Sequence, residues 1–254
     1  MFNKALASIG IGTAKVDTKL MQTTVVPGGE ISGTVHIQGG KTEQKIDEIY
    51  LALHTTYIKK VNDRKQTLSA VIDRIRLNEP FTIGPDETKQ IPFSYNLPLD
   101  VPITIGRTKV WVTTSLDIKN AVDPTDKDFL NVVPNNLMNA ILDVTEELGF
   151  RLREADCEQA PYRLRRRLPF IQEFELVPVM GSFRGRLDEL ELVFFPLSDD
   201  ELEMYMQVDR RARGIGGLLS EALEMDESNI QLTLTISDLP ALKQKLHQAI
   251  NRYS

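Results

Sequence analysis

The most constraining feature of this sequence is the alternation of apolar and polar residues over short runs in its first half. The runs ISGTVHI (31–37), IPFSYNL (91–97) and TKVWVTTSLDI (108–118) place an apolar or small residue at nearly every second position. This period of two predicts strands that each bury one face. Glycine, proline and aspartate lie between the runs, as in 27–29 and 84–86, and predict tight turns. Several strands with no helical period between them predict a β-sandwich.

The period changes after Pro134. In VVPNNLMNAILDVTEELGF the apolar residues follow helical spacing, Asn135 or Asn136 can cap the start, and Gly149 can end the helix. Strand patterns resume at 188–195 and 230–236, and GIGGLLSEALEM between them predicts a short helix. We therefore predict a mainly β fold. It consists of two tandem β-sandwich domains, 1–134 and 135–254, with a few short helices in the second half.

The last segment, SDLPALKQKLHQAINRYS, predicts a C-terminal helix with one apolar face. Two interpretations of this face stay open: it packs on the sheet of its own domain, or it docks a partner. The residues that form it are Leu239, Leu242, Leu246 and Ile250.

Composition narrows the classes of function. The chain has 36 acidic and 30 basic residues, a net charge of −6, so it lacks the basic field that duplex-binding proteins present, and we expect no nucleic acid partner. Its single cysteine, Cys157, excludes an internal disulfide and suits a reducing cytoplasm. No apolar run is long enough to span a bilayer.

No motif predicts an enzyme, and we expect no cofactor. The three histidines, His36, His54 and His247, have no spacing partner that suggests a metal pair or a nucleophile relay. Acidic neighbours would raise the pKa of the Cys157 thiol and make it a poor nucleophile. The acidic turn DPTDKD (123–128) misses the EF-hand spacing. A weak cation site, a solvated turn and a partner for arginines all remain open for it.

Four arginines stand close together in RLRRRLPF, within the more acidic half of the chain. If 162–168 is a strand, Arg163, Arg165 and Arg167 point to one side, and Arg166 lies in the apolar row on the other. One interpretation is a solvated outer face with the stem of Arg166 packed below it. The other is a buried ionic network between the domains, in which Arg166 must be paired with carboxylates.

Under the second interpretation, the protein has a polar core, a network of buried charges between its two domains, which we treat as a hypothetical site. Such a network could latch two domain arrangements. Its members would be Arg166, Arg163 and Arg165 with Asp117, Asp126, Asp128, Glu154 and Asp156.

Six long motifs are distributed along the chain: ASIGIGTAKVDTKL, GRTKVWVTTSLDIKNAVDPTDKD, GFRLREADCE, RLRRRLPFIQEFELVP, FRGRLDELELVFFP and VDRRARGIGGLLSEALEMDES. They resemble the bacterial sporulation-control protein M family, from residue 1 to about residue 236. The resemblance implies an arrestin-like fold with a polar core near the junction of two sandwiches. It also implies a cytoplasmic regulator, not an enzyme, that influences sporulation and related developmental steps through protein contacts.

The leading hypothesis is an adaptor that binds other proteins through strand edges, the arginines or the C-terminal helix. The alternative is a sandwich that binds an anionic small ligand or lipid headgroup over Arg163, Arg165 and Arg167. An enzyme is the third hypothesis. We expect protein partners and no membrane span, and we leave dimerisation open.

Overall fold

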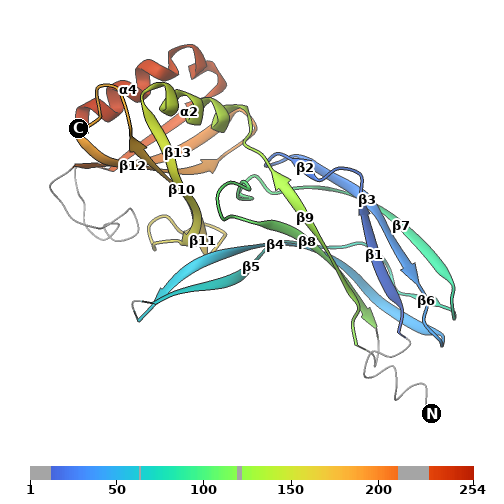
Figure 1. The fold of residues 1–254 in the computed structure, drawn as a ribbon. Coiled ribbons are helices and arrows are strands. Elements are labelled where there is room, and N and C mark those ends of the chain that lie inside the picture. The colour runs from blue at the N-terminus through green and yellow to red at the C-terminus, as the bar shows by residue number, and fades with distance from the viewer. Residues whose placement is uncertain (1–12, 63, 119–121, 211–228) are drawn as a thin grey trace. The chain divides into compact units, whose positions relative to one another are not determined.

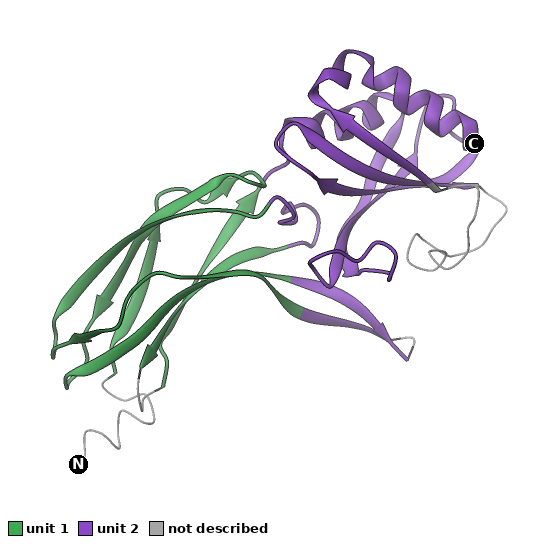
Figure 2. Ribbon diagram, turned by 180° about the vertical axis from the view of Figure 1, so that it is seen from behind, with its two compact units in different colours: residues 1–55, 69–98, 109–132 green, residues 56–68, 99–108, 133–254 purple. Residues whose placement is uncertain are grey.

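The computed structural model describes residues 13–62, 64–118, 122–210 and 229–254. They form two compact units, and each unit combines several stretches of the sequence (Figure 2). Unit 1 comprises Met1–Thr55, Ser69–Pro98 and Lys109–Val132, and unit 2 comprises Thr56–Leu68, Leu99–Thr108 and Val133–Ser254. The chain therefore enters unit 2 twice before its second half begins. The predicted boundary at Pro134 stays a prediction about independently folding domains.

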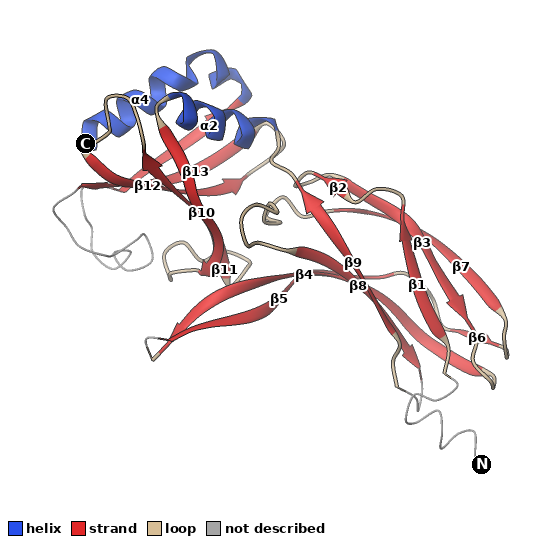
Figure 3. Ribbon diagram, viewed as in Figure 1, coloured by secondary structure: helices blue, strands red, loops and turns tan. Residues whose placement is uncertain are grey.

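Unit 1 is built from strands that form two sheets (Figure 3). One is a three-stranded antiparallel sheet in the order β1-β3-β7, with strands Lys15–Leu20, Glu30–Gln38 and Thr88–Asn96. The other sheet has the order β4-β8-β9-β2, and β5 and β6 pair with β4. Its strands are β2 (Thr24–Val25), β4 (Gln44–Val61), β5 (Arg64–Arg76), β6 (Phe81–Ile83), β8 (Val110–Ile118) and β9 (Thr125–Val132).

The core of unit 1 lies between these two sheets and follows from the alternation in the sequence. In β3, Ile31, Gly33, Val35 and Ile37 are buried, while the residues that alternate with them are only half-buried, as predicted. Val35 and Ile37 share a core cluster with Ile49 and Leu116 of the other sheet, and the last two have no exposed surface. Burial of such aliphatic side chains stabilises the fold by about 1.5–3 kcal/mol each.

Unit 2 contains an antiparallel sheet in the order β14-β13-β12-β11-β10. The end of β4 that belongs to unit 2 joins this sheet, because Ile58 pairs with Glu158 in a parallel register. Helices α2 (Asn136–Glu147) and α4 (Leu242–Tyr253) cover one face of the sheet and form its second layer (Figure 1). The strands are β10 (Phe150–Gln159), β11 (Phe170–Pro178), β12 (Leu187–Pro196), β13 (Glu201–Arg210) and β14 (Asn229–Thr235), and the 3-10 helix η1 (Ile236–Ala241) precedes α4.

The helix predicted after Pro134 is α2, with the signals that the sequence shows. The side chain of Asn135 accepts a hydrogen bond of 2.9 Å from the backbone N–H of Met138, and Gly149 follows the helix at φ 97°. A side chain at Gly149 would also meet the carbonyl oxygen of Met180 at 2.2 Å, so only glycine fits. The mainly β fold class with few helices is confirmed. The helix predicted over GIGGLLSEALEM lies outside the described residues.

Candidate functional site

The predicted polar-core residues belong to both units. Asp117 on β8 and Asp126 and Asp128 on β9 lie in unit 1. Glu154 and Asp156 on β10, and the arginines that follow β10, lie in unit 2. Each group has partners within its own unit. The network between the units stays a prediction.

The arginines lie in a loop, residues 160–169, so the condition of the parity argument, a strand over 162–168, does not hold. The backbone N–H of Leu164 donates to the carbonyl of Pro161 in a turn, and Ala160 N–H donates to the Pro169 carbonyl, both at 3.0 Å. Leu164 and Leu168 are both buried and anchor the loop. Prolines at both ends lack the N–H that a continuous strand ladder requires, so the backbone closes on itself instead.

Arg166 is the packed member of the cluster. Its Nη2 donates to Oε2 of Glu203 at 2.6 Å, and its guanidinium lies 3.9 Å from the centroid of the Phe195 ring. Burial alone would raise the pKa of Glu203, but hydrogen bonds from Arg166 and Tyr205 hold it below its usual value. The carboxylate partner of Arg166 is thus a residue that was not among the predicted candidates. Glu203 lies on β13, and no local pattern links it to the loop.

The other three arginines differ in their contacts. Arg167 pairs with Asp100, and its Nε donates to Oδ2 of that residue at 3.0 Å. Arg163 and Arg165 are exposed, and no described residue forms a hydrogen bond or ion pair with either of them. Two arginines therefore fix the loop, and two point into solvent.

We expect Arg166→Ala to lower the free energy of unfolding by about 1–2 kcal/mol, because it removes one partly exposed ion pair and one cation–π contact. Arg165→Ala should change it by less than about 0.5 kcal/mol, since its side chain is exposed. Chemical denaturation of both variants measures the difference. Equal losses would contradict the assignment of Arg166 as the packed arginine.

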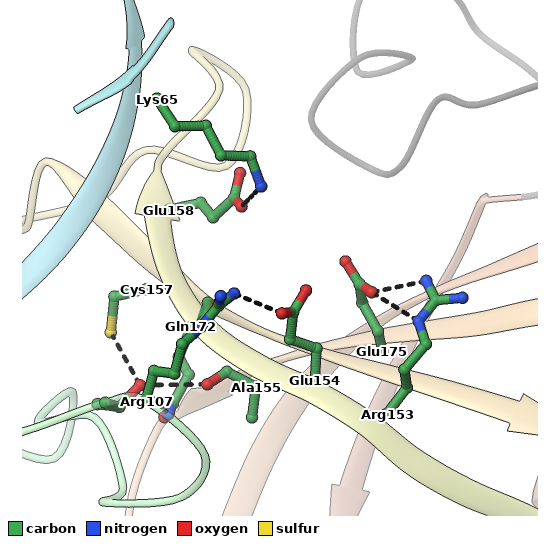
Figure 4. A network of polar contacts seen from close by, with 11 residues as sticks. Lys65, Arg107, Arg153, Glu154, Ala155, Cys157, Glu158, Gln172 and Glu175 are labelled. Atoms are coloured by element: carbon green, nitrogen blue, oxygen red, sulfur yellow. Dashed lines mark hydrogen bonds and ion pairs between the residues drawn. The ribbon is translucent and has the colours of Figure 1, made fainter. Parts of the chain in front are cut away.

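Glu154 and Asp156 are bound by Arg107, which the sequence analysis missed. Figure 4 shows the contact of Arg107 with Glu154. Arg107 Nη2 contacts both carboxylates, and its Nε donates to Asp156 at 3.2 Å. Only 8% of Asp156 is exposed, so this arginine compensates a nearly buried charge. Arg107 follows Gly106, whose φ of 62° permits the turn beside the backbone of Ala155. The signal in the sequence was a glycine–arginine pair in a turn, but its partners lie about 50 residues away.

The strand register collects further carboxylates on the same face of the unit 2 sheet. Asp156 lies opposite Glu173, Glu154 opposite Glu175, and Glu175 opposite Glu191. Arg153 Nη2 donates to Glu175 at 2.6 Å, and Lys65 lies 3.8 Å from Glu158 (Figure 4). The same Nη2 also contacts Glu189. We call this set the acidic face. It consists of Glu154, Asp156, Glu158, Glu173, Glu175, Glu189 and Glu191.

Glu173 and Glu191 form a buried carboxyl pair within the acidic face. Glu173 is 5% exposed and Glu191 is 2% exposed. Burial, and then the charge of Glu191 and a hydrogen bond with it, raise the pKa of Glu173 to about 10. The pair therefore holds a proton at neutral pH, because two buried carboxylates side by side cannot both ionise at low cost.

The acids predicted in unit 1 form a smaller group. Asp126 Oδ2 accepts from the backbone N–H of Thr18 at 2.6 Å, and Thr18 and Thr114 share a hydrogen bond of 2.6 Å. The pKa of Asp128 is raised to about 6, mainly by burial and to a smaller extent by the negative charges of Asp126 and Asp17 nearby. Asp117 is exposed. The described residues contain no group of three His, Cys, Asp or Glu side chains placed to hold a metal ion.

The apolar face of the C-terminal helix is largely internal to unit 2. Leu242, Leu246 and Ile250 are at most 1% exposed, and α4 contacts α2. Leu239 lies in η1 and is 36% exposed.

Two of the side chains considered for catalysis have structural contacts. Cys157 is buried, and His54 stacks on Trp111 with ring centroids 5.5 Å apart. In the described part of the chain, no helix is long and apolar enough to cross a membrane.

Fold and site together define a mainly β, two-unit protein in which ion pairs fix Arg166 and Arg167 of an anchored loop, while Arg163 and Arg165 of the same loop are exposed. The chain belongs to the SpoOM protein family (Spo0M), whose model matches residues 2–212. It is 45% identical over 256 residues to the sporulation-control protein spo0M of Bacillus subtilis (strain 168), covering 100% of this chain and 98% of that protein. The crystal structure of Spo0M from Bacillus subtilis is similar, with a TM-score of 0.89 over 96% of this chain and 100% of that chain.

Proposed function

We propose that this protein is a cytoplasmic regulator of sporulation and related developmental steps that acts as an adaptor through protein contacts and has no enzymatic activity of its own. The observation that carries this proposal is the similarity, over the whole chain, to a protein named for sporulation control. The geometry supports it. Several carboxylates of unit 2 are paired with arginine, among them Glu154, Glu175 and Glu203, and the exposed Arg163 and Arg165 are available to a partner.

Complementation in Bacillus subtilis tests the regulatory role. A strain that lacks its own Spo0M should regain normal sporulation when it produces this chain, measured as the count of heat-resistant spores. In-cell crosslinking followed by affinity capture of this chain should recover the same small set of proteins in repeated experiments. A chain that neither restores sporulation nor recovers any protein would contradict the proposal.

The alternative is a module that binds an anionic small ligand or lipid headgroup. The exposed Arg163 and Arg165 favour it as a second candidate, but Arg167 does not, since it is paired with Asp100. A shift in the thermal unfolding midpoint with inorganic phosphate or a soluble headgroup, with no protein recovered by capture, would favour this alternative.

A further inference from the structure

The loop at residues 160–169 lies beside a second basic hairpin of unit 2. Phe170, at the end of the loop, stacks on Tyr57 with ring centroids 5.7 Å apart, and Glu158, just before the loop, pairs with Ile58. Residue Lys65 approaches the same Glu158. The β4–β5 hairpin and the arginine loop are therefore neighbours.

These two segments are basic, whereas the rest of the protein is acidic. In the sequence, 56–68 and 160–169 contain eight basic residues and one acidic residue, a charge of +7. Because the whole chain carries −6, all other residues together carry −13. Three of these basic residues, Lys65, Arg166 and Arg167, pair with acids outside the two segments. The other five basic residues still outnumber the one acid of the segments, so two neighbouring hairpins of an acidic protein carry an excess of positive charge.

The loop presents the side chains that protein interfaces most often use as anchors. Tyr162 is 94% exposed, and Arg163 and Arg165 are exposed on either side of the buried Leu164. Tyrosine and arginine are enriched among the residues that dominate binding energy. The loop is anchored by Leu164 and Leu168 and fixed by the ion pairs of Arg166 and Arg167, so little conformational entropy is lost on binding.

We propose that Tyr162, Arg163 and Arg165 form the docking site for an acidic, extended segment of a partner protein, with Lys60 and Arg64 of the neighbouring hairpin adding to the attraction. This proposal rests on the adaptor function proposed above. The two guanidinium groups bind carboxylates of the segment, with the planar fork geometry that makes arginine selective for them. The phenol of Tyr162 packs on an apolar side chain between those carboxylates.

A short acidic segment suits this surface better than an extended anionic one. Beyond about 8–10 Å, salt screens the charges, so a segment of a few residues meets mainly the unpaired basic residues of the two hairpins. A bilayer or a nucleic acid extends over a wider area and also meets the acidic remainder of the protein, which repels it. Complementary charge therefore selects a local protein segment as the occupant.

The test uses the full chain and a fluorescein-labelled peptide that alternates glutamate with glycine and contains one leucine, followed by fluorescence anisotropy. The variant R163E/R165E should weaken binding at least about tenfold, since it removes two charge-assisted contacts and replaces them with repulsion. The matched control R151E/R184E makes the same change in charge at exposed arginines elsewhere in unit 2. It should weaken binding less than about twofold. Replacing each glutamate of the peptide by glutamine should abolish binding.

Two further measurements decide between this site and other occupants. Co-sedimentation with phosphatidylglycerol vesicles should show no binding that depends on Arg163 and Arg165, and light scattering should show no self-association that depends on them. Dependence on these arginines in either experiment, or equal peptide affinities of R163E/R165E and R151E/R184E, would overturn the proposal. Because both residues are exposed, R163E/R165E should unfold like the parent chain, and R163Q/R165Q provides a milder variant if it does not.

The outcomes separate this proposal from the proposed function. A chain that restores sporulation in Bacillus subtilis but does not bind the acidic peptide contradicts only the docking site. A chain that binds the peptide through Arg163 and Arg165 but does not restore sporulation contradicts the regulatory role.

Discussion

Replacing Leu246 by alanine is expected to lower the free energy of unfolding by about 2–4 kcal/mol, because the side chain is 1% exposed in α4 and its removal leaves a cavity. Chemical denaturation of the two proteins measures the loss. An effect of this size requires that the apolar face of α4 is packed inside the folded chain. A face packed in this way would have little surface left for binding a partner protein.

The control for Leu246→Ala is a substitution on the outer side of the same helix. Lys243 is 57% exposed and pairs with Glu147 at 2.9 Å. Lys243→Ala should therefore change the free energy of unfolding by less than about 0.5 kcal/mol. If Leu246→Ala cost as little as Lys243→Ala, α4 would not be packed as described, and the docking interpretation of its apolar face would regain support.

The second large effect is a gain in stability. Glu173→Gln is expected to raise the free energy of unfolding at pH 7 by about 1–3 kcal/mol. The folded protein holds a proton on Glu173, with a pKa of about 10, whereas the unfolded chain releases it with a pKa near 4.5. An amide needs no proton to be neutral, has nearly the same shape, and can still donate a hydrogen bond to Glu191.

The sign of the pH dependence follows from this proton. Between pH 4.5 and about 10 the folded state binds more protons than the unfolded state, so stability falls as the pH rises. Burial and the charges of Glu191, Glu158 and Glu175 cause the shift. Glu173→Gln should therefore flatten the curve of unfolding free energy against pH across this range.

Glu175→Gln is the matched control for this pair. Its side chain is 25% exposed and paired with Arg153, so the substitution should lower the free energy of unfolding by up to about 1 kcal/mol. The pH dependence assigned to Glu173 should remain. If Glu173→Gln destabilised the protein and left the curve unchanged, the shared proton would be refuted.

Local patterns in the sequence predicted most of the fold. Alternation in β3 and β8 gave the buried faces of these strands, since side chains alternate across any strand whatever its partners. The cap at Asn135 and the glycine at Gly149 gave the limits of α2, because both act within one helical turn.

The arginine loop shows where local patterns fail. Leu164 and Leu168 fit the alternation of a strand, which only Arg166 interrupts, yet the two leucines anchor a loop. Arg107 and Glu203 were missed for a related reason. Their partners lie on strands distant in the sequence, and the register that brings them together is set by the whole sheet.

The interleaving of the two units has a consequence for dissecting this protein genetically. A fragment that begins at residue 135 lacks 56–68 and 99–108, which belong to unit 2. Such a fragment loses Arg107 and Asp100, so Asp156 and Arg167 are left without the partners that they have in the intact chain. Truncating the gene or exchanging its halves would thus remove charged residues that the remaining half needs for its own structure. The phenotype of such a mutant would reflect misfolding of the remaining half before it reflected a missing activity.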